Sequence, residues 1–399
     1  MKKFRGILRT MVSLPQKISH IASAYSRVHW LYLFTIVGVL SGIALSLPTW
    51  SSIRTYPLVP VIESFVLPSY AHTMLLSVFV VSLLTSIRYQ SHRAHLLLLS
   101  VLSLGLLCLL DVTRFQPWIF HYISLIGILA IAFYANTSSE KILDAARILI
   151  GGMYFWSGVQ KLNGTFFAAD FPWFTKPLWN IAPDFLLPAF LFFGLLVPFL
   201  EIALALGLFY ARTRSAAVFG SFCMMALVLL CLGPLGHNWN SAVWPWNIIL
   251  FLSTITVFWR TDFSTTSFII RQKQNLLGLS MFCVFWILPL GNVFGLVDHY
   301  LSWSLYSGKA PEATLSGDPL ILSTLSPNIQ DNELSYARWT MKEMNVVPYP
   351  EERVFYTVFQ AVCSQFNQDP SLVLQVESSQ SYFNTEKITT QQSCSHFTE

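Results

Sequence analysis

The chain has 399 residues, of which 54% are hydrophobic and 11% are charged, and its formal net charge is +4 at pH 7. Soluble domains carry roughly 25% charged residues, so a chain this apolar cannot present a polar surface to water on every side. The composition excludes an ordinary soluble globular protein and predicts an all-α polytopic membrane protein.

The first 29 residues form a basic N-terminal segment that contains six Lys or Arg residues and no acidic residue. The first long apolar run begins only at Trp30 and shows no small-residue cleavage site, so this segment does not resemble a secretory signal. We predict that residues 1–29 are an amphipathic cytoplasmic segment lying on the inner leaflet.

Apolar segments then follow one another through residues 30–298, which we predict to be the transmembrane domain. A membrane core of ~30 Å takes about 20 helical residues, and about nine segments reach or approach that length. They lie near residues 30–47, 70–87, 96–110, 118–135, 145–162, 185–210, 216–236, 242–259 and 276–297.

Basic residues predict the orientation of these segments. After the N-terminal segment, Lys and Arg cluster on alternate loops, all on the side of the N-terminus. Cytoplasmic loops are the ones enriched in Lys and Arg, so the N-terminus is expected in the cytoplasm and the C-terminal region outside. The clusters are Arg88 and Arg93, Lys141 and Arg147, Arg212 and Arg214, and Arg260, Arg271 and Lys273.

Residues 299–399 turn polar, and we predict a small mixed α+β exoplasmic region there. The patterns favour helices near 334–344 and 352–365, a strand near 372–376, and disorder in the last dozen residues. Cys363 and Cys394 share this oxidising compartment, and the sequence leaves open whether they pair. No cysteine spacing typical of a metal site occurs, so no metal is expected.

Two charged residues lie in apolar helices. Lys161 ends the 145–162 segment, where it is either a base in apolar surroundings or a lysine that snorkels to the headgroups. Glu201 lies well inside the 185–210 segment, so it must be protonated or paired. It could pair with Lys161, line a cavity, or hydrogen-bond to a neighbouring helix.

Further polar residues map to the same, outer, side of the predicted bundle. A polar cluster at one mouth of an apolar bundle is typical of a site for a lipophilic ligand. The alternative for the tryptophans is an interfacial aromatic belt, and for a single histidine an interfacial hydrogen bond. The cluster comprises Asp111, Arg114, His121, Lys161, His237, Asn238 and Asn247.

The segment Tyr154-Phe-Trp-Ser-Gly-Val-Gln-Lys-Leu-Asn163 resembles the motif that carries the catalytic lysine of vitamin K-dependent gamma-glutamyl carboxylase and of the related bacterial transmembrane (HTTM) family. Three further stretches resemble that family in order and spacing, across roughly residues 30–259. They are Pro117-Trp-Ile-Phe-His121, Leu-Glu201-Ile-Ala-Leu and His237-Asn-Trp-Asn-Ser.

The resemblance implies that the protein binds and oxidises a reduced quinone of the vitamin K or menaquinone type, forming an epoxide, with Lys161 as the base. His121 would assist, and His237 would contact the reaction centre. The residues expected around the quinone are Asn238, Asn247, Trp118, Glu201 and Arg114. The family's bacterial spread further implies a bacterial inner membrane, and we expect no nucleic acid partner.

Two departures from the family weigh on the choice of function. Gln160 stands where the family's enzyme has a first lysine, and the tail of about 100 residues is much shorter than the lumenal portion of the animal enzyme. Both favour quinol oxidation or binding over carboxylation of a peptide substrate. The main alternative is a non-catalytic subunit that binds quinone or lipid, with an exoplasmic tail that binds a partner protein. A transporter ranks last, because no inverted repeat is apparent.

Overall fold

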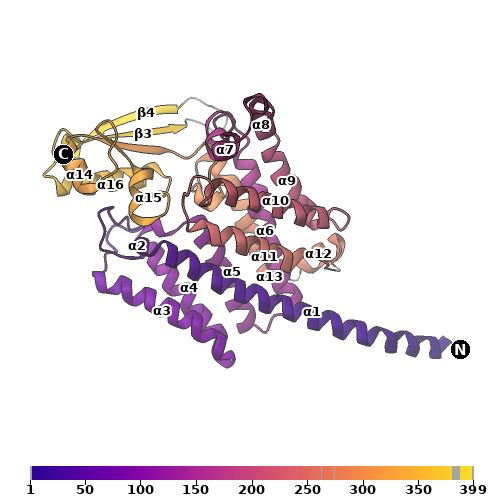
Figure 1. The fold of residues 1–399 in the computed structure, drawn as a ribbon. Helices are drawn as coiled ribbons and strands as arrows, with labels where there is room; N and C mark the ends of the chain where they lie inside the picture. The colour runs from indigo at the N-terminus through magenta and orange to yellow at the C-terminus, as the bar shows by residue number, and fades with distance from the viewer. Residues whose placement is uncertain (1, 262, 274, 380–386, 398–399) are drawn as a thin grey trace.

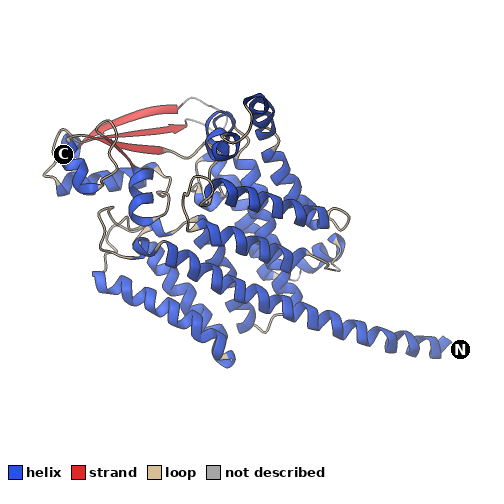
Figure 2. Ribbon diagram, viewed as in Figure 1, coloured by secondary structure: helices blue, strands red, loops and turns tan. Residues whose placement is uncertain are grey.

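The computed structural model describes residues 2–261, 263–273, 275–379 and 387–397. A helical bundle makes up most of the molecule, and a small sheet with its own helices covers one end of it (Figures 1 and 2). The prediction of a mostly helical membrane-type fold with a small mixed C-terminal region is confirmed at this level.

The bundle consists of long helices joined by short helical turns. The α-helices are α1 (Lys2–Leu45), α2 (Leu47–Trp50), α3 (Ser69–Arg88), α4 (Arg93–Leu110), α5 (Pro117–Tyr134), α6 (Ser139–Gln160), α7 (Phe171–Trp179), α8 (Leu187–Gly194), α9 (Val197–Phe209), α10 (Arg214–Leu232), α11 (Val243–Phe258), α12 (Thr265–Gln272) and α13 (Leu276–Phe282). The short 3₁₀ or π turns are η1 (Gln90–His92), η2 (Val112–Arg114), η3 (Phe166–Asp170), η4 (Asp184–Leu186), η5 (Cys283–Ile287), η6 (Leu288–Phe294) and η7 (Tyr300–Ser302).

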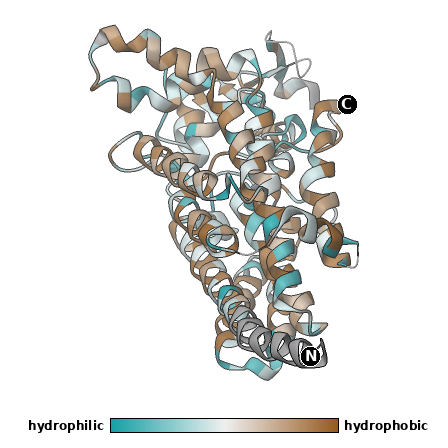
Figure 3. Ribbon diagram, turned by 90° about the vertical axis from the view of Figure 1, so that its right-hand side faces the viewer, coloured by the Kyte–Doolittle hydropathy of each residue, from teal (hydrophilic) through white to brown (hydrophobic). Residues whose placement is uncertain are grey.

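Six helical stretches of the described chain are long and apolar enough to cross a membrane, and the bent pair α8 and α9 makes a seventh if it is one span. Hydrophobic residues cover much of these helices (Figure 3). Helices also occupy the remaining predicted positions, but α11 is shorter and α6 carries Asp144 and Arg147. The structure therefore supports a multi-pass membrane protein, while the count of nine spans stays a prediction.

Helix α1 runs without a break from Lys2 to Leu45, so the predicted basic N-terminal segment and the first apolar run belong to one helix. Its N-terminal part extends beyond the rest of the bundle (Figure 1). From Ser23 onward the helix is apolar enough to span.

The C-terminal region forms a four-stranded antiparallel sheet in the order β2-β1-β3-β4. Leu315, Leu374 and Val376 are fully buried or nearly so, and pack with the apolar face of the longest local helix. The elements are β1 (Glu312–Ser316), α14 (Pro319–Leu325), β2 (Glu333–Ser335), α15 (Tyr336–Met344), α16 (Glu352–Gln365), β3 (Val373–Ser379), β4 (Lys387–Ser393) and η8 (Cys394–Phe397).

The helices predicted near 334–344 and 352–365 and the strand near 372–376 are confirmed as α15, α16 and β3. The prediction that the last dozen residues are disordered is wrong for residues 388–397. Strand β4 pairs with β3 along its whole length, and a disulfide between Cys363 and Cys394 ties the following turn to α16. Pairing and covalent closure supply the order that this polar sequence does not predict.

The C-terminal region is docked on one end of the bundle by hydrogen bonds. The Glu343 carboxylate accepts from the backbone N–H groups of Thr55 and Tyr56. Asn345 Nδ2 donates to the Leu45 carbonyl at 2.7 Å, and Trp339 Nε1 donates to Thr55 Oγ1 at 3.0 Å. These contacts hold α15 against the end of α1 and the loop that follows α2.

Replacement of Cys363 and Cys394 by serine should destabilise the C-terminal region by about 3–4 kcal/mol, because the bridge closes a loop of 31 residues. Limited proteolysis of the purified protein should then cut β4 faster than in the wild type. Cys223→Ser, at an exposed free cysteine of α10, is the control and should leave the rate unchanged. Equal protection of the double variant would contradict the expectation.

Candidate functional site

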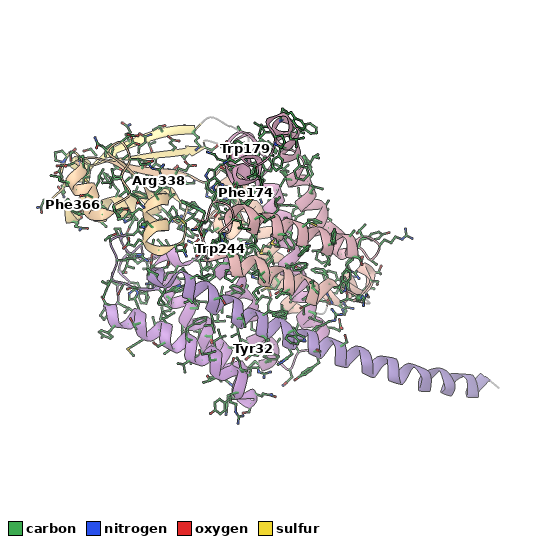
Figure 4. The ribbon with its side chains drawn as sticks, viewed as in Figure 1. Tyr32, Phe174, Trp179, Trp244, Arg338 and Phe366 are labelled. Atoms are coloured by element: carbon green, nitrogen blue, oxygen red, sulfur yellow. A yellow bond between two sulfur atoms is a disulfide. The ribbon has the colours of Figure 1, made fainter. Side chains whose placement is uncertain are left out.

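A cavity of about 150 Å³ lies among α6, α7, α9, α10 and α11. Its wall is mostly apolar, and its polar members include Lys161, Glu201 and Asn247. Three residues that follow the last apolar helix also line it, namely Trp303, Leu305 and Tyr306. Helix α7 brings Phe174 to the cavity and lies beside the C-terminal sheet (Figure 4).

Lys161 and Glu201 form an ion pair at the cavity wall. Lys161 Nζ lies 2.8 Å from Glu201 Oε2, and both side chains are about nine-tenths buried. The ammonium also donates to the Ser157 hydroxyl at 2.7 Å and to the Ser157 carbonyl at 3.1 Å. Three acceptors thus match its three N–H donors. Of the options that the sequence left open for Glu201, the structure shows two, because Glu201 pairs with Lys161 and lines the cavity.

Gly158 allows α6 and α9 to approach closely enough for this pair. A Cβ atom at Gly158 would lie 2.7 Å from the Pro198 carbonyl oxygen and 3.0 Å from Glu201 Cβ. Such distances are too short for any side chain, so only glycine permits this crossing without a shift. Glu201 lies one turn beyond Pro198 on α9 and so faces the end of α6.

Asn247 on α11 lines the same cavity, and its Nδ2 donates to the Val243 carbonyl at 2.8 Å. His121 does not itself line the cavity. Its Nδ1 accepts a hydrogen bond from Trp246 Nε1 at 3.1 Å, and Trp246 lines the cavity. Since Nδ1 accepts, neutral His121 carries its proton on Nε2, which has no partner among the described residues.

His237 lies near the α7 side of the cavity without lining it. Its Nε2 donates to the Trp173 carbonyl at 2.7 Å, and its ring stacks on the Trp173 indole with centroids 4.6 Å apart. Trp173 also stacks on Tyr306, which does line the cavity. His237 therefore fastens α7 to the turn after α10, whereas Asn238 is exposed and does not line this cavity.

Arg114 and Trp118 lie away from the cavity. Arg114 is fully buried, donates to backbone carbonyls at the ends of α2 and α4, and contacts His72 Nδ1 at 2.9 Å. It lies 3.6 Å from Asp111, which also pairs with Arg54 at 2.6 Å. Trp118 packs against Gly42 of α1 and Trp50 of α2. Both residues hold helix ends together, so their predicted place around a quinone does not match this cavity.

Several cavity residues were not singled out from the sequence. Ser157 was identifiable, because it lies four residues before Lys161 on the same helix face. Trp303 and Tyr306 were not, because the segment after the last apolar helix carries no motif. No group of three or more His, Cys, Asp or Glu side chains within the described ranges could hold a metal ion.

Asp170, in η3 between α6 and α7, is partly buried and lies close enough to Lys161 for its charge to act on the carboxyl. Burial raises the pKa of its carboxyl to about 6, while the Gly308 backbone N–H and the Lys161 charge act in the opposite direction. Gly308 packs directly on Thr165 and Phe166, so the loop that follows Tyr306 closes over this turn.

Gly158→Ala should lower the stability of the bundle by about 1–3 kcal/mol, because the added methyl group overpacks the crossing of α6 and α9. Gly127→Ala on α5 is the matched control, since a Cβ there meets nothing within 4 Å and helix propensity favours alanine by up to about 1 kcal/mol. Thermal unfolding in detergent measures both. Equal unfolding temperatures for the two variants would contradict the proposed close crossing.

Asp170 should make stability fall as pH rises from about 4 to about 6. Its carboxyl holds a proton more tightly in the folded than in the unfolded chain, so the folded state is favoured on the acid side of that window. Asp170→Asn should flatten the difference in unfolding temperature between about pH 5 and about pH 7. The exposed Asp331→Asn should keep the wild-type profile, and an unchanged profile in Asp170→Asn would refute the assignment.

Comparison of the chain with protein-family models, with curated proteins and with solved structures found no match. The likeness of residues 154–163 to the carboxylase-related family therefore stays a prediction from the sequence.

Proposed function

We propose that the protein is an integral membrane protein that binds a reduced quinone-type lipid in the cavity and oxidises it. The observation that carries the proposal is the Lys161–Glu201 pair, set in the wall of a mostly apolar cavity of about 150 Å³. An engineered cavity of similar size holds one benzene ring, so the hydroxyl-bearing ring of a quinol fits in scale. The tail of such a lipid would suit the apolar helices around it.

The proposed topology has nine spans, a cytoplasmic N-terminus and an exoplasmic C-terminal region in a bacterial inner membrane. The alternation of basic loops supports this orientation. The disulfide between Cys363 and Cys394 is also in keeping with an oxidising compartment for the C-terminal region. In this topology Lys161 lies toward the outer face.

In the proposed mechanism a bound quinol supplies a ring hydroxyl and the electrons for reaction with oxygen. Lys161 acts as the base together with Glu201. Transfer of one proton across the 2.8 Å contact leaves a neutral amine at Lys161 and a carboxylic acid at Glu201. The amine lone pair can then take the hydroxyl proton. Phe171 and Phe174 of α7 add apolar lining to the same cavity.

A second candidate is a non-catalytic subunit that binds quinone or lipid and uses its exoplasmic region to hold a partner protein. The complete match between the Lys161 donors and their acceptors favours this candidate, because a fully satisfied ion pair can serve structure alone. The enzyme requires Lys161 to lose and regain a proton, whereas the binding subunit does not.

Lys161→Arg should lower the rate of quinol epoxidation by about 100-fold or more, because arginine does not give up its proton and a general base contributes 10²–10⁴ in rate. The assay uses purified protein, vitamin K hydroquinone or reduced menaquinone, oxygen and bicarbonate, and detects epoxide by mass spectrometry. Glu201→Gln should lose activity similarly. Lys176→Ala, at an exposed lysine of α7, should keep it.

Two results would count against the enzyme. Folded wild-type protein that binds the quinol but forms no epoxide would favour the binding subunit. Full activity in Lys161→Arg would remove Lys161 from the mechanism.

A further inference from the structure

The orientation of the Asn247 amide is determined by its neighbour on α11. Its Nδ2 lies 2.8 Å from the Val243 carbonyl oxygen, one helical turn earlier. A backbone carbonyl only accepts hydrogen bonds, so the NH₂ group must face it. The amide oxygen Oδ1 is thereby turned away from the helix backbone.

Asn247 Oδ1 accepts no hydrogen bond from any residue that the structure describes. Asn247 is 6% exposed and lines the cavity, and its Oδ1 is not sealed off as the unpartnered Oδ1 of Asn240 is. An unmatched acceptor in an otherwise apolar wall is costly unless a donor from a ligand or water meets it.

The other polar atoms of the wall match this picture. Glu201 Oε2 is engaged by Lys161, and no described side chain donates to Oε1. The three ammonium donors of Lys161 already have acceptors, and the Thr175 hydroxyl donates to the Phe171 carbonyl. The cavity thus offers two open acceptors, Glu201 Oε1 on α9 and Asn247 Oδ1 on α11, and one hydroxyl donor, that of Ser157, which accepts from Lys161 but donates to no described residue.

We propose that Asn247 Oδ1 accepts a hydrogen bond from a ligand hydroxyl and makes the site selective for the hydroxyl-bearing, reduced form of an aromatic diol over its carbonyl-bearing, oxidised form. The inference rests on the proposed function and adds a residue that reads the redox state of the ligand. A ring carbonyl in the same place would set one acceptor against another and leave Oδ1 unpaired. Product with carbonyl oxygens would then leave the site more readily than substrate.

The test measures the dissociation constants of menadiol and menadione, which share one ring system, for the purified protein under anaerobic conditions. Wild-type protein should bind menadiol about tenfold more tightly, which corresponds to one hydrogen bond and the avoided unpaired acceptor. Asn247→Leu, which keeps the size of the side chain, should bind both forms about equally.

Asn247→Asp should keep the preference, because a protonated carboxyl can donate to Val243 and present its carbonyl oxygen to the cavity. Thr256→Val is the matched control on α11. It also loses a bond to a helix carbonyl four residues earlier, but Thr256 does not line this cavity, so the preference should persist.

Equal binding of the two forms by the wild type, or an undiminished preference in Asn247→Leu, would overturn the role of Asn247 and leave the proposed quinol site standing. Binding of neither form by folded wild-type protein would overturn both. Loss of all binding in Asn247→Leu alone, with folding shown by an unchanged unfolding temperature, would support contact with the ligand but not selectivity, and so would refute the inference as stated.

Discussion

The ion pair between Lys161 and Glu201 is the interaction on which the candidate site depends. Each charge alone among apolar helices would cost several kcal/mol, so neither residue is tolerable there without the other. The pair in turn requires that α6 and α9 cross closely, and Gly158 is the residue that permits it. Helix packing, charge and cavity shape at this point are thus consequences of one constraint.

Buried charges are also paired at both ends of the bundle. Asp111 is buried between Arg54 and Arg114 where α2 and η2 meet, and Asp144 is buried between Arg147 and Arg271 where α6 meets α12. The arginines of these networks also donate to backbone carbonyls, so the networks hold the ends of neighbouring helices together. The Lys161–Glu201 pair differs from them because it borders a cavity.

Much of the fold could be predicted because long apolar runs leave a chain few options but helices. The bounds of α16 follow from its amphipathic spacing. Strand β1 alternates between buried and more exposed residues, but only over five residues, which is too short a pattern to predict a strand by itself. Strand β4 is almost entirely polar and gains its order by pairing with β3. The bridge from Cys363 to Cys394 likewise depends on the pairing of β4 with β3, which no local sequence pattern predicts.

For the site, charge in an apolar segment was the reliable signal, and it identified Lys161 and Glu201. A predicted position on the outer side of the bundle was a weaker signal of a cavity residue. It grouped Arg114 with the cavity, but Arg114 donates to backbone carbonyls at the ends of α2 and α4. Trp303 and Tyr306 reach the cavity because the chain turns back over the bundle after its last apolar helix. That course depends on tertiary contacts such as the one from Asn163 Nδ2 to the Ser307 carbonyl at 2.6 Å, which the sequence does not reveal.

Photo-crosslinking tests the central claim most directly. A naphthoquinol carrying a diazirine on its ring would be irradiated with the full-length protein in nanodiscs, and the labelled peptides identified by mass spectrometry. The account predicts label on α6, α9, α11 and residues 303–306, removed by excess unlabelled menadiol. Label confined to the lipid-facing helices α3 and α4, or label that menadiol does not displace, would contradict a ligand site at Lys161 and Glu201.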